Sequence, residues 1–202
     1  MAHEGLWEQL EKLDGISTAK RAKCQYLSDH RRYIITLLNT KYAVDISDRN
    51  IFSVQPGSPQ KPAKFLEQLC LLAYLINAQD LPPTNKLVSA HALPSGQFFF
   101  RGFHSIPTEK LEKIFGQHPR QLLKSSKLFD AKECEFGDAS IQLYVLPRIP
   151  LTIVIWGQCE EFDARASILF DQTASSELPL DALLTAVNLT VEALTKAATE
   201  SS

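Results

Sequence analysis

The most distinctive group of residues is an aromatic run, GQFFFRGFHSIP, which begins at Gly96. If this run forms a β-strand, Phe98, Phe100, Gly102 and His104 share one face of it, because side chains alternate along a strand. Two aromatic rings, a position without a side chain and an imidazole suit a flat apolar ligand that contains a metal. The run therefore predicts a tetrapyrrole site, for haem or a corrinoid, with His104 as the axial metal ligand.

Two arginines could neutralise the carboxylates of such a ligand. Arg101 lies on the opposite face of the expected strand, and Arg148 lies in the motif Leu-Pro-Arg-Ile-Pro, whose prolines restrict its backbone. The alternative for Arg148 is an ion pair with Glu160, Glu161 or Asp163 across a hairpin. In the first interpretation the guanidinium of Arg148 binds a ligand, and in the second it binds an acidic residue of the protein.

A structural interpretation of the aromatic run stands beside the cofactor interpretation. Phenylalanines on both faces of a strand are typical of a core, Gly102 can mark a bulge, and His104 can bond a backbone carbonyl at the start of a helix. Trp156 is also expected in the core. His91 would complete a site with two histidines if its segment paired with that of His104 in a hairpin.

Three classes of function are open. The first is a non-catalytic module that holds the cofactor, and the second is an accessory protein that contacts a partner enzyme and has no ligand of its own. The third is an enzyme with an unfamiliar site built from Arg148, Asp163 and Asp171. The sequence lacks Walker and Rossmann glycine loops, a GxSxG elbow and an HExxH motif, which argues against common nucleotide enzymes and hydrolases.

Composition limits the location and partners of the protein. The 202 residues carry 21 Lys and Arg against 23 Asp and Glu, a net charge of −2, so no overall attraction to nucleic acid is expected. No apolar run reaches the about 20 residues of a membrane span, and the N-terminus lacks a signal pattern. We therefore expect a cytoplasmic protein without a membrane partner. The four cysteines form no CxxC pair and are expected to be buried free thiols.

Hydrophobic periodicity predicts the elements that position these residues. HEGLWEQLEKL indicates a first helix, and residues 1–30 as a whole are expected to be helical. YIITLLNTKYAVDIS indicates a β-hairpin, and FLEQLCLLAYLINA, which begins at Phe65, indicates a helix buried on most sides. Residues 87–103 are expected to be extended.

The second half predicts a short helix near Leu111, an alternating strand SIQLYVL, a doubly covered strand LTIVIW and a further strand ARASILFD. An amphipathic helix follows Pro179, and residues 196–202 are expected to be frayed. The predicted elements do not follow the repeating strand–helix–strand order of a parallel sheet. The pattern favours a single α+β domain over residues 1–202, with a mainly antiparallel sheet packed with the buried central helix and N- and C-terminal amphipathic helices.

Three pieces, SGQFFFRGFHSIP, LPRIPLTIVIW and ILFD before the last helix, resemble in that order the prokaryotic family catalogued as domain of unknown function 3786. The resemblance extends from about Tyr33 onward. It implies a protein of anaerobic bacteria or archaea, and it makes a corrinoid or haem neighbourhood more plausible. Some members are joined to an iron–sulfur domain similar to that of corrinoid iron–sulfur proteins. This chain lacks the cysteine cluster of that domain, so the resemblance implies a redox or methyl-transfer protein as partner, and it assigns no residue a role.

Overall fold

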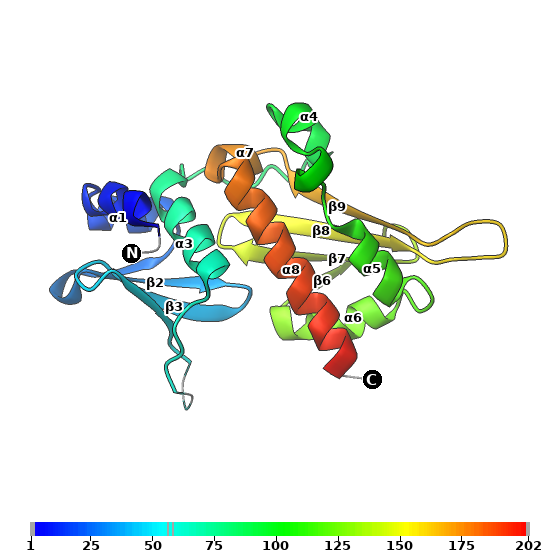
Figure 1. The fold of residues 1–202 in the computed structure, drawn as a ribbon, viewed down its shortest axis with the longest axis horizontal. Helices are drawn as coiled ribbons and strands as arrows, with labels where there is room; N and C mark the ends of the chain where they lie inside the picture. Colours follow the sequence, from blue (N-terminus) through cyan, green and yellow to red (C-terminus); the bar gives the residue numbers. More distant parts are fainter. Residues whose placement is uncertain (1–2, 56, 58, 201–202) are drawn as a thin grey trace.

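The computed structural model describes residues 3–200 except 56 and 58. It has an α+β fold with two antiparallel sheets side by side (Figure 1). The strand order is β1-β2-β3-β4 in the first sheet and β5-β9-β8-β7-β6 in the second. We call residues 3–77 the N-terminal lobe and residues 87–200 the C-terminal lobe. The predicted α+β class is confirmed, with two sheets rather than one.

The N-terminal lobe is a four-stranded sheet preceded by two helices. Its elements before the third helix are α1 (Glu4–Glu11), α2 (Gly15–Arg21), β1 (Gln25–Leu27), the 3-10 turn η1 (Ser28–His30), β2 (Arg32–Leu37), β3 (Thr40–Asp45) and β4 (Asn50–Ser53). β2 and β3 form the predicted hairpin, and both residues of its turn, Leu38 and Asn39, have positive φ, as type I′ turns require. The expectation of helix throughout residues 1–30 is wrong at its end, because β1 pairs with β2 as an edge strand, and residues 1–2 lie outside the described residues.

α3 (Phe65–Asn77) is the predicted buried helix. Residues 70–75 in its centre are all buried, whereas Phe65 and Leu66 at its start are exposed. The helix packs against α1 and against the C-terminal helix, so it lies where the two lobes meet. A hydrophobic core that includes residues 70–75 continues from one lobe into the other.

The C-terminal lobe is a five-stranded sheet with helices on one face. Its elements are β5 (Leu87–Ser89), η2 (Ala90–Ala92), α4 (Gly96–Phe99), η3 (Gly102–His104), α5 (Thr108–Phe115), α6 (Gln121–Ser125), η4 (Ser126–Phe129), β6 (Lys132–Cys134), β7 (Ala139–Leu146), β8 (Ile149–Trp156), β9 (Arg165–Asp171), α7 (Ala174–Glu177) and α8 (Leu180–Glu200). α8 crosses the face of the sheet diagonally (Figure 1). The amphipathic spacing of its leucines and valines is explained by this contact.

β8 is the predicted central strand. Residues 149–155 are all buried, so side chains on both faces of the strand are covered, and β7 and β9 pair along its two edges. Trp156 at its end is exposed, so the expectation that this ring belongs to the core is wrong. The arginine side chain of Arg165 covers the ring instead, with its guanidinium carbon 5.9 Å from the ring centroid.

Two further expectations differ from the structure. Residues 87–103 are extended only as far as Ser89, and short helical turns follow. α8 continues to Glu200 with Ala197 and Ala198 buried, so it includes most of the segment expected to be frayed, while residues 201–202 lie outside the described residues. Within the described part of the chain, no helix has the length and apolar character needed to cross a membrane.

Candidate functional site

The aromatic run does not form a strand. Residues 96–99 are the short helix α4 and residues 102–104 are the 3-10 turn η3. Two glycines explain the difference. A Cβ on Gly96 would lie 2.0 Å from the carbonyl oxygen of Ala90, so only glycine allows this close approach, and Gly102 has φ of 56°, which breaks any extended path.

The predicted ligand-binding face is therefore not formed. Phe100 is 2% exposed and packs in the core against Phe170, with ring centroids 6.3 Å apart. Phe98 points the other way and is 70% exposed, while Gly102 and His104 are also exposed. Because the backbone turns here, the four residues do not alternate as they would in a strand, and Phe100 is not available to a ligand.

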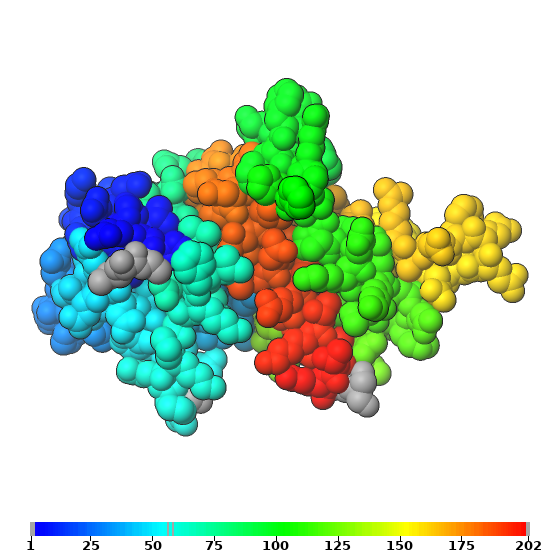
Figure 2. All heavy atoms as spheres, in the orientation of Figure 1, coloured from blue at the N-terminus to red at the C-terminus, as the bar shows by residue number. Residues whose placement is uncertain are grey.

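The same residues form a projecting element that we call the aromatic knob, residues 96–104. Figure 2 shows it as the green projection at the edge of the molecule. Phe103 is fully exposed, and the guanidinium of Arg101 lies 5.7 Å from the ring centroid of Phe98. The rings of Phe99 and His104 stack with their centroids 4.7 Å apart and 3° between their planes. The knob thus presents aromatic rings, a cation and an imidazole to solvent.

The His104 ring does not have the structural role that was the alternative prediction. Over the described residues, no hydrogen bond joins its nitrogens to a backbone carbonyl, and the ring is held by stacking on Phe99. His91 lies in η2, which packs against α4, and its side chain is exposed. The site with two histidines stays a prediction, and Arg101 stays a candidate for an anionic partner.

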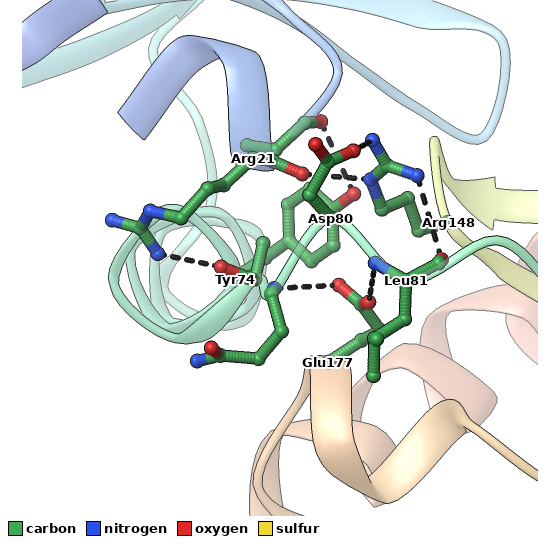
Figure 3. Close-up of polar contacts among 9 residues, drawn as sticks. Arg21, Tyr74, Asp80, Leu81, Arg148 and Glu177 are labelled. Carbon is green, nitrogen blue, oxygen red and sulfur yellow. Dashed lines mark hydrogen bonds and ion pairs between the residues drawn. The ribbon is translucent and has the colours of Figure 1, made fainter. Parts of the chain in front are cut away.

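The guanidinium of Arg148 is bonded to other groups of the protein. It lies in the tight turn between β7 and β8, and its side chain is only 11% exposed. Its Nη2 forms an ion pair with the Oδ1 of Asp80, and its Nε donates to the carbonyl oxygen of Arg21 at 2.7 Å (Figure 3). The expected pairing with Glu160, Glu161 or Asp163 is wrong, because these residues follow the far end of β8.

The groups around Arg148 join four elements, and we call them the Arg148 junction. The hydroxyl of Tyr74 donates to the carbonyl oxygen of Ala22 at 3.1 Å, and burial raises the pKa of that phenol. Glu177 of α7 is fully buried and accepts from the backbone N–H groups of Gln79 at 3.0 Å and Leu81 at 2.9 Å. The junction therefore connects α2, α3, α7 and the β7–β8 turn.

Asp171 binds the following part of the segment that connects the two lobes. Its buried carboxylate accepts hydrogen bonds from the backbone and hydroxyl groups of Thr84 and Thr173 and from the N–H of Asn85 at 2.6 Å. Burial alone would raise the pKa of this carboxyl, but the hydrogen bonds outweigh burial and lower it. Asp171 therefore has a structural environment rather than that of an accessible general base.

The enzyme site suggested for Arg148, Asp163 and Asp171 is not formed. Arg148 precedes β8 and Asp163 follows it, so the length of the strand, about 26 Å for eight residues, separates their ends of the sheet. The three groups do not converge in one cleft. The parts of the chain described by the structure also contain no group of three or more His, Cys, Asp or Glu side chains that could hold a metal ion.

The four cysteines are free, but only Cys70 is fully buried. Burial raises the pKa of the Cys24 and Cys70 thiols to about 12, which keeps them protonated. Cys159 is exposed in the loop that follows β8. The expectation of buried thiols is confirmed for Cys70 and wrong for Cys159.

A pocket between the lobes was not predicted from the sequence. It has a volume of about 190 Å³ and lies between the β2–β3 hairpin, the start of α3, η4 and α8. Figure 2 shows the hollow between the cyan segment and the red C-terminal helix. We call it the interlobe pocket. Its walls come from residues more than 100 positions apart in the chain, so no local pattern indicates it.

One residue of the pocket, Tyr42, is held by its surroundings. Its ring is buried, and burial together with the neighbouring Glu67 carboxylate raises the pKa of its hydroxyl, which donates a hydrogen bond to Glu67. Glu67 also accepts from the backbone N–H of Lys64 at 2.7 Å and so caps α3. One side of the pocket is therefore fixed by hydrogen bonds.

Comparison with known proteins gives one match. No curated protein and no solved structure matches the chain. The model of the family described as "Domain of unknown function (DUF3786)" matches residues 14–193. That match spans both lobes, the aromatic knob, the Arg148 junction and most of α8. The chain therefore belongs to the DUF3786 family, as the resemblance of its aromatic run and its Leu-Pro-Arg-Ile-Pro motif indicated.

Proposed function

We propose that the protein is a non-catalytic, cytoplasmic accessory module that docks on a partner protein through the aromatic knob. The observation that carries this proposal is the exposure of two phenylalanine rings, Phe98 and Phe103, on one projecting element. Exposed apolar rings grouped in this way are typical of interaction surfaces, and aromatic and arginine side chains contribute most to binding at such surfaces.

The charge of the knob indicates the kind of surface that it contacts. Arg101 is the only residue among Lys, Arg, Asp and Glu between residues 87 and 108, and His91 and His104 are the only other titratable side chains there. A partner with an apolar pocket rimmed by carboxylates would complement it. The family resemblance suggests a redox or methyl-transfer protein of anaerobic metabolism as that partner.

The way the knob is anchored supports a docking role. Phe100 inserts into the core, and Gly96 packs directly on the backbone of Ala90. Because the backbone is fixed at both points, Phe98 and Phe103 are presented by an ordered element. Preorganisation of this kind lowers the entropy that binding costs.

A photocrosslinking amino acid at position 103, introduced into the protein in its host cells, tests the proposal. Phe162 offers a matched control position, because it is 70% exposed, as Phe98 is, but lies on the β8–β9 loop. We expect a discrete crosslinked protein from position 103 that position 162 does not yield. Equal products from both positions would contradict docking through the knob.

The purified partner then allows affinity to be measured. We expect Phe98→Ala and Phe103→Ala each to weaken binding about 10-fold or more, which corresponds to about 1.4 kcal/mol, and Phe162→Ala to change it less than about 2-fold. Arg101→Glu should weaken binding more than Arg101→Ala, since it places a negative charge against the carboxylate rim. A partner that binds all these variants equally would rule out the knob as the contact.

A second candidate function is to bind a tetrapyrrole at the surface of the knob. The observation that favours it is the exposed His104 ring, whose nitrogens are free of protein hydrogen bonds over the described residues and whose plane is set by Phe99. Phe98 and Phe103 would contact the macrocycle, and Arg101 its carboxylates. The change from the sequence expectation is that Phe100 and Arg148, which are bound within the protein, have no contact role, while Gly102 stays on the exposed surface beside His104.

Absorption spectroscopy of the protein mixed with haem or with cobalamin tests this second candidate. Ligation by His104 should shift the Soret or corrinoid bands, and His104→Ala should abolish the shift. His118→Ala is the matched control, because His118 is also exposed. Unshifted bands with both ligands, or a shift that survives in His104→Ala, would show that His104 is no metal ligand.

A further inference from the structure

The interlobe pocket has an apolar end. Its walls there are Leu37 and Leu38 from the β2–β3 hairpin, Phe129 from η4, and Leu189 and Ala193 from α8. An apolar cavity of about 150 Å³ can hold a benzene molecule, so the first cavity, whose whole volume is about 190 Å³, accommodates at most roughly six to eight carbon atoms. This end fits a short apolar chain or a single ring.

The pocket continues into a polar end. A second cavity, of about 230 Å³, shares Tyr42 and Lys64 with the first and adds Ser53, Gln55 and Lys61. Hydroxyl, amide and ammonium groups that can donate hydrogen bonds line this end, together with the carboxylate of Glu67. The two cavities share lining residues and together form one elongated site, which is apolar between Leu37, Phe129 and Leu189 and rich in donors at β4.

The charges of the site favour an anion. Lys61 and Lys64 have no ion pair over the residues that the structure describes, whereas the carboxylate of Glu67 is already used by Tyr42 and by the start of α3. Lys196 of α8 also lines the pocket and forms an ion pair with exposed Glu200 at 3.7 Å, and Glu192 is the second carboxylate of the lining. Two uncommitted ammonium groups thus stand at the polar end of a protein whose net charge is −2.

We propose that the interlobe pocket binds an amphipathic anion, with an apolar tail of about six to eight carbons between the hairpin and α8 and a carboxylate or phosphate head at Lys61 and Lys64. The size of the apolar end, the donors of the polar end and the two free lysines carry this inference. It does not depend on the aromatic knob, so either proposal can fail alone. Pockets of this kind are common where two lobes meet.

Isothermal titration calorimetry with a ladder of straight-chain carboxylates, from butanoate to dodecanoate, tests the site. Each added methylene buried in the apolar end should strengthen binding about 4-fold, and the gain should stop near eight to nine carbons, when that end is full. Octanol and octylamine should bind at least about 10-fold more weakly than octanoate. Octyl phosphate compared with octanoate identifies the preferred head group.

Matched variants locate the ligand. Ala193→Trp should fill the apolar end and abolish octanoate binding, and Lys61→Gln with Lys64→Gln should weaken it about 10-fold or more while leaving octanol unaffected. Lys86→Gln, another exposed lysine outside the pocket, is the control and should change nothing. Thermal unfolding of each variant without ligand shows whether it is folded.

Several results would overturn the proposal. They are octylamine binding as tightly as octanoate, affinity that rises without limit along the ladder, unchanged octanoate binding in folded Ala193→Trp, or no binding of octanoate or octyl phosphate at millimolar concentration. Equally tight binding of octylamine would show that the lysines do not recognise the charge of the head group. The others would show that the apolar end is not the tail site.

Discussion

The guanidinium of Arg148 and the carboxylate of Asp80 form an ion pair across 68 residues of sequence. The pair joins the β7–β8 turn of the C-terminal lobe to the segment that leaves α3. Arg148 also donates to the carbonyl oxygen of Arg21 in the N-terminal lobe, so one side chain holds both lobes and the connection between them.

Replacement of Arg148 tests this arrangement. Arg148→Ala leaves Asp80 and the backbone carbonyls of Arg21 and Leu81 without their charged partner, and we expect a loss of about 2–4 kcal/mol in the free energy of unfolding. Arg165→Ala, which removes a cation from the surface of Trp156, should cost less than about 1 kcal/mol. Urea unfolding measures both. Equal destabilisation by the two variants would contradict the central role of Arg148.

Asp171 predicts how stability depends on pH. Its pKa is lowered in the folded protein below the ordinary value of 3.8, so its contribution is present above pH 3.8 and is lost as the pH falls through the folded value. Asp171→Asn should lower stability at neutral pH and flatten the loss of stability below pH 4. Urea midpoints from pH 2.5 to pH 7 measure this. Asp163→Asn is the control, and a similar flattening there would argue against Asp171 as the source.

Phenylalanines within the aromatic knob should separate into two classes. Phe100→Ala opens a cavity beside Phe170 and should cost about 3–5 kcal/mol, whereas Phe98→Ala and Phe103→Ala should change the free energy of unfolding by less than about 0.5 kcal/mol. Thermal and urea unfolding compare the three variants. A large loss with Phe103→Ala would mean that its ring is part of the core in solution.

Thiol reactivity should follow burial. Cys159 is exposed and should react with a chromogenic disulfide within minutes at pH 8, while Cys70 should react only on unfolding, because its pKa is raised to about 12. Quantifying released chromophore before and after denaturation measures both. The variant Cys159→Ser should remove the fast phase, and a fast phase that persists in it would contradict this assignment.

Local patterns predicted much of the fold. The β2–β3 hairpin, α3, β7 to β9 and α8 each have a clear hydrophobic period, and the turn at Asn39 suits a short hairpin connection. These elements depend on residues close together in sequence. Period and turn chemistry are therefore sufficient to locate them.

The site was harder to predict because it depends on distant contacts. The aromatic run is rich in phenylalanine, which favours strands, but the chain forms helical turns there, where Gly96 approaches Ala90 and Gly102 has a left-handed backbone. The partner of Arg148 is 68 residues away, and its nearer acids lie beyond the opposite end of β8. The interlobe pocket exists only once β3, α3 and α8 are assembled.

The segment between the lobes, residues 78–86, has a consequence for how the protein melts. Glu177 holds its first part and Asp171 its last, so it is bound to the C-terminal lobe along its length rather than acting as a flexible tether. The two lobes also share one hydrophobic core and the Arg148–Arg21 hydrogen bond, so heat that loosens one lobe removes packing contacts of the other. The two sheets should therefore lose structure in a single calorimetric transition, in which the calorimetric and van't Hoff enthalpies agree.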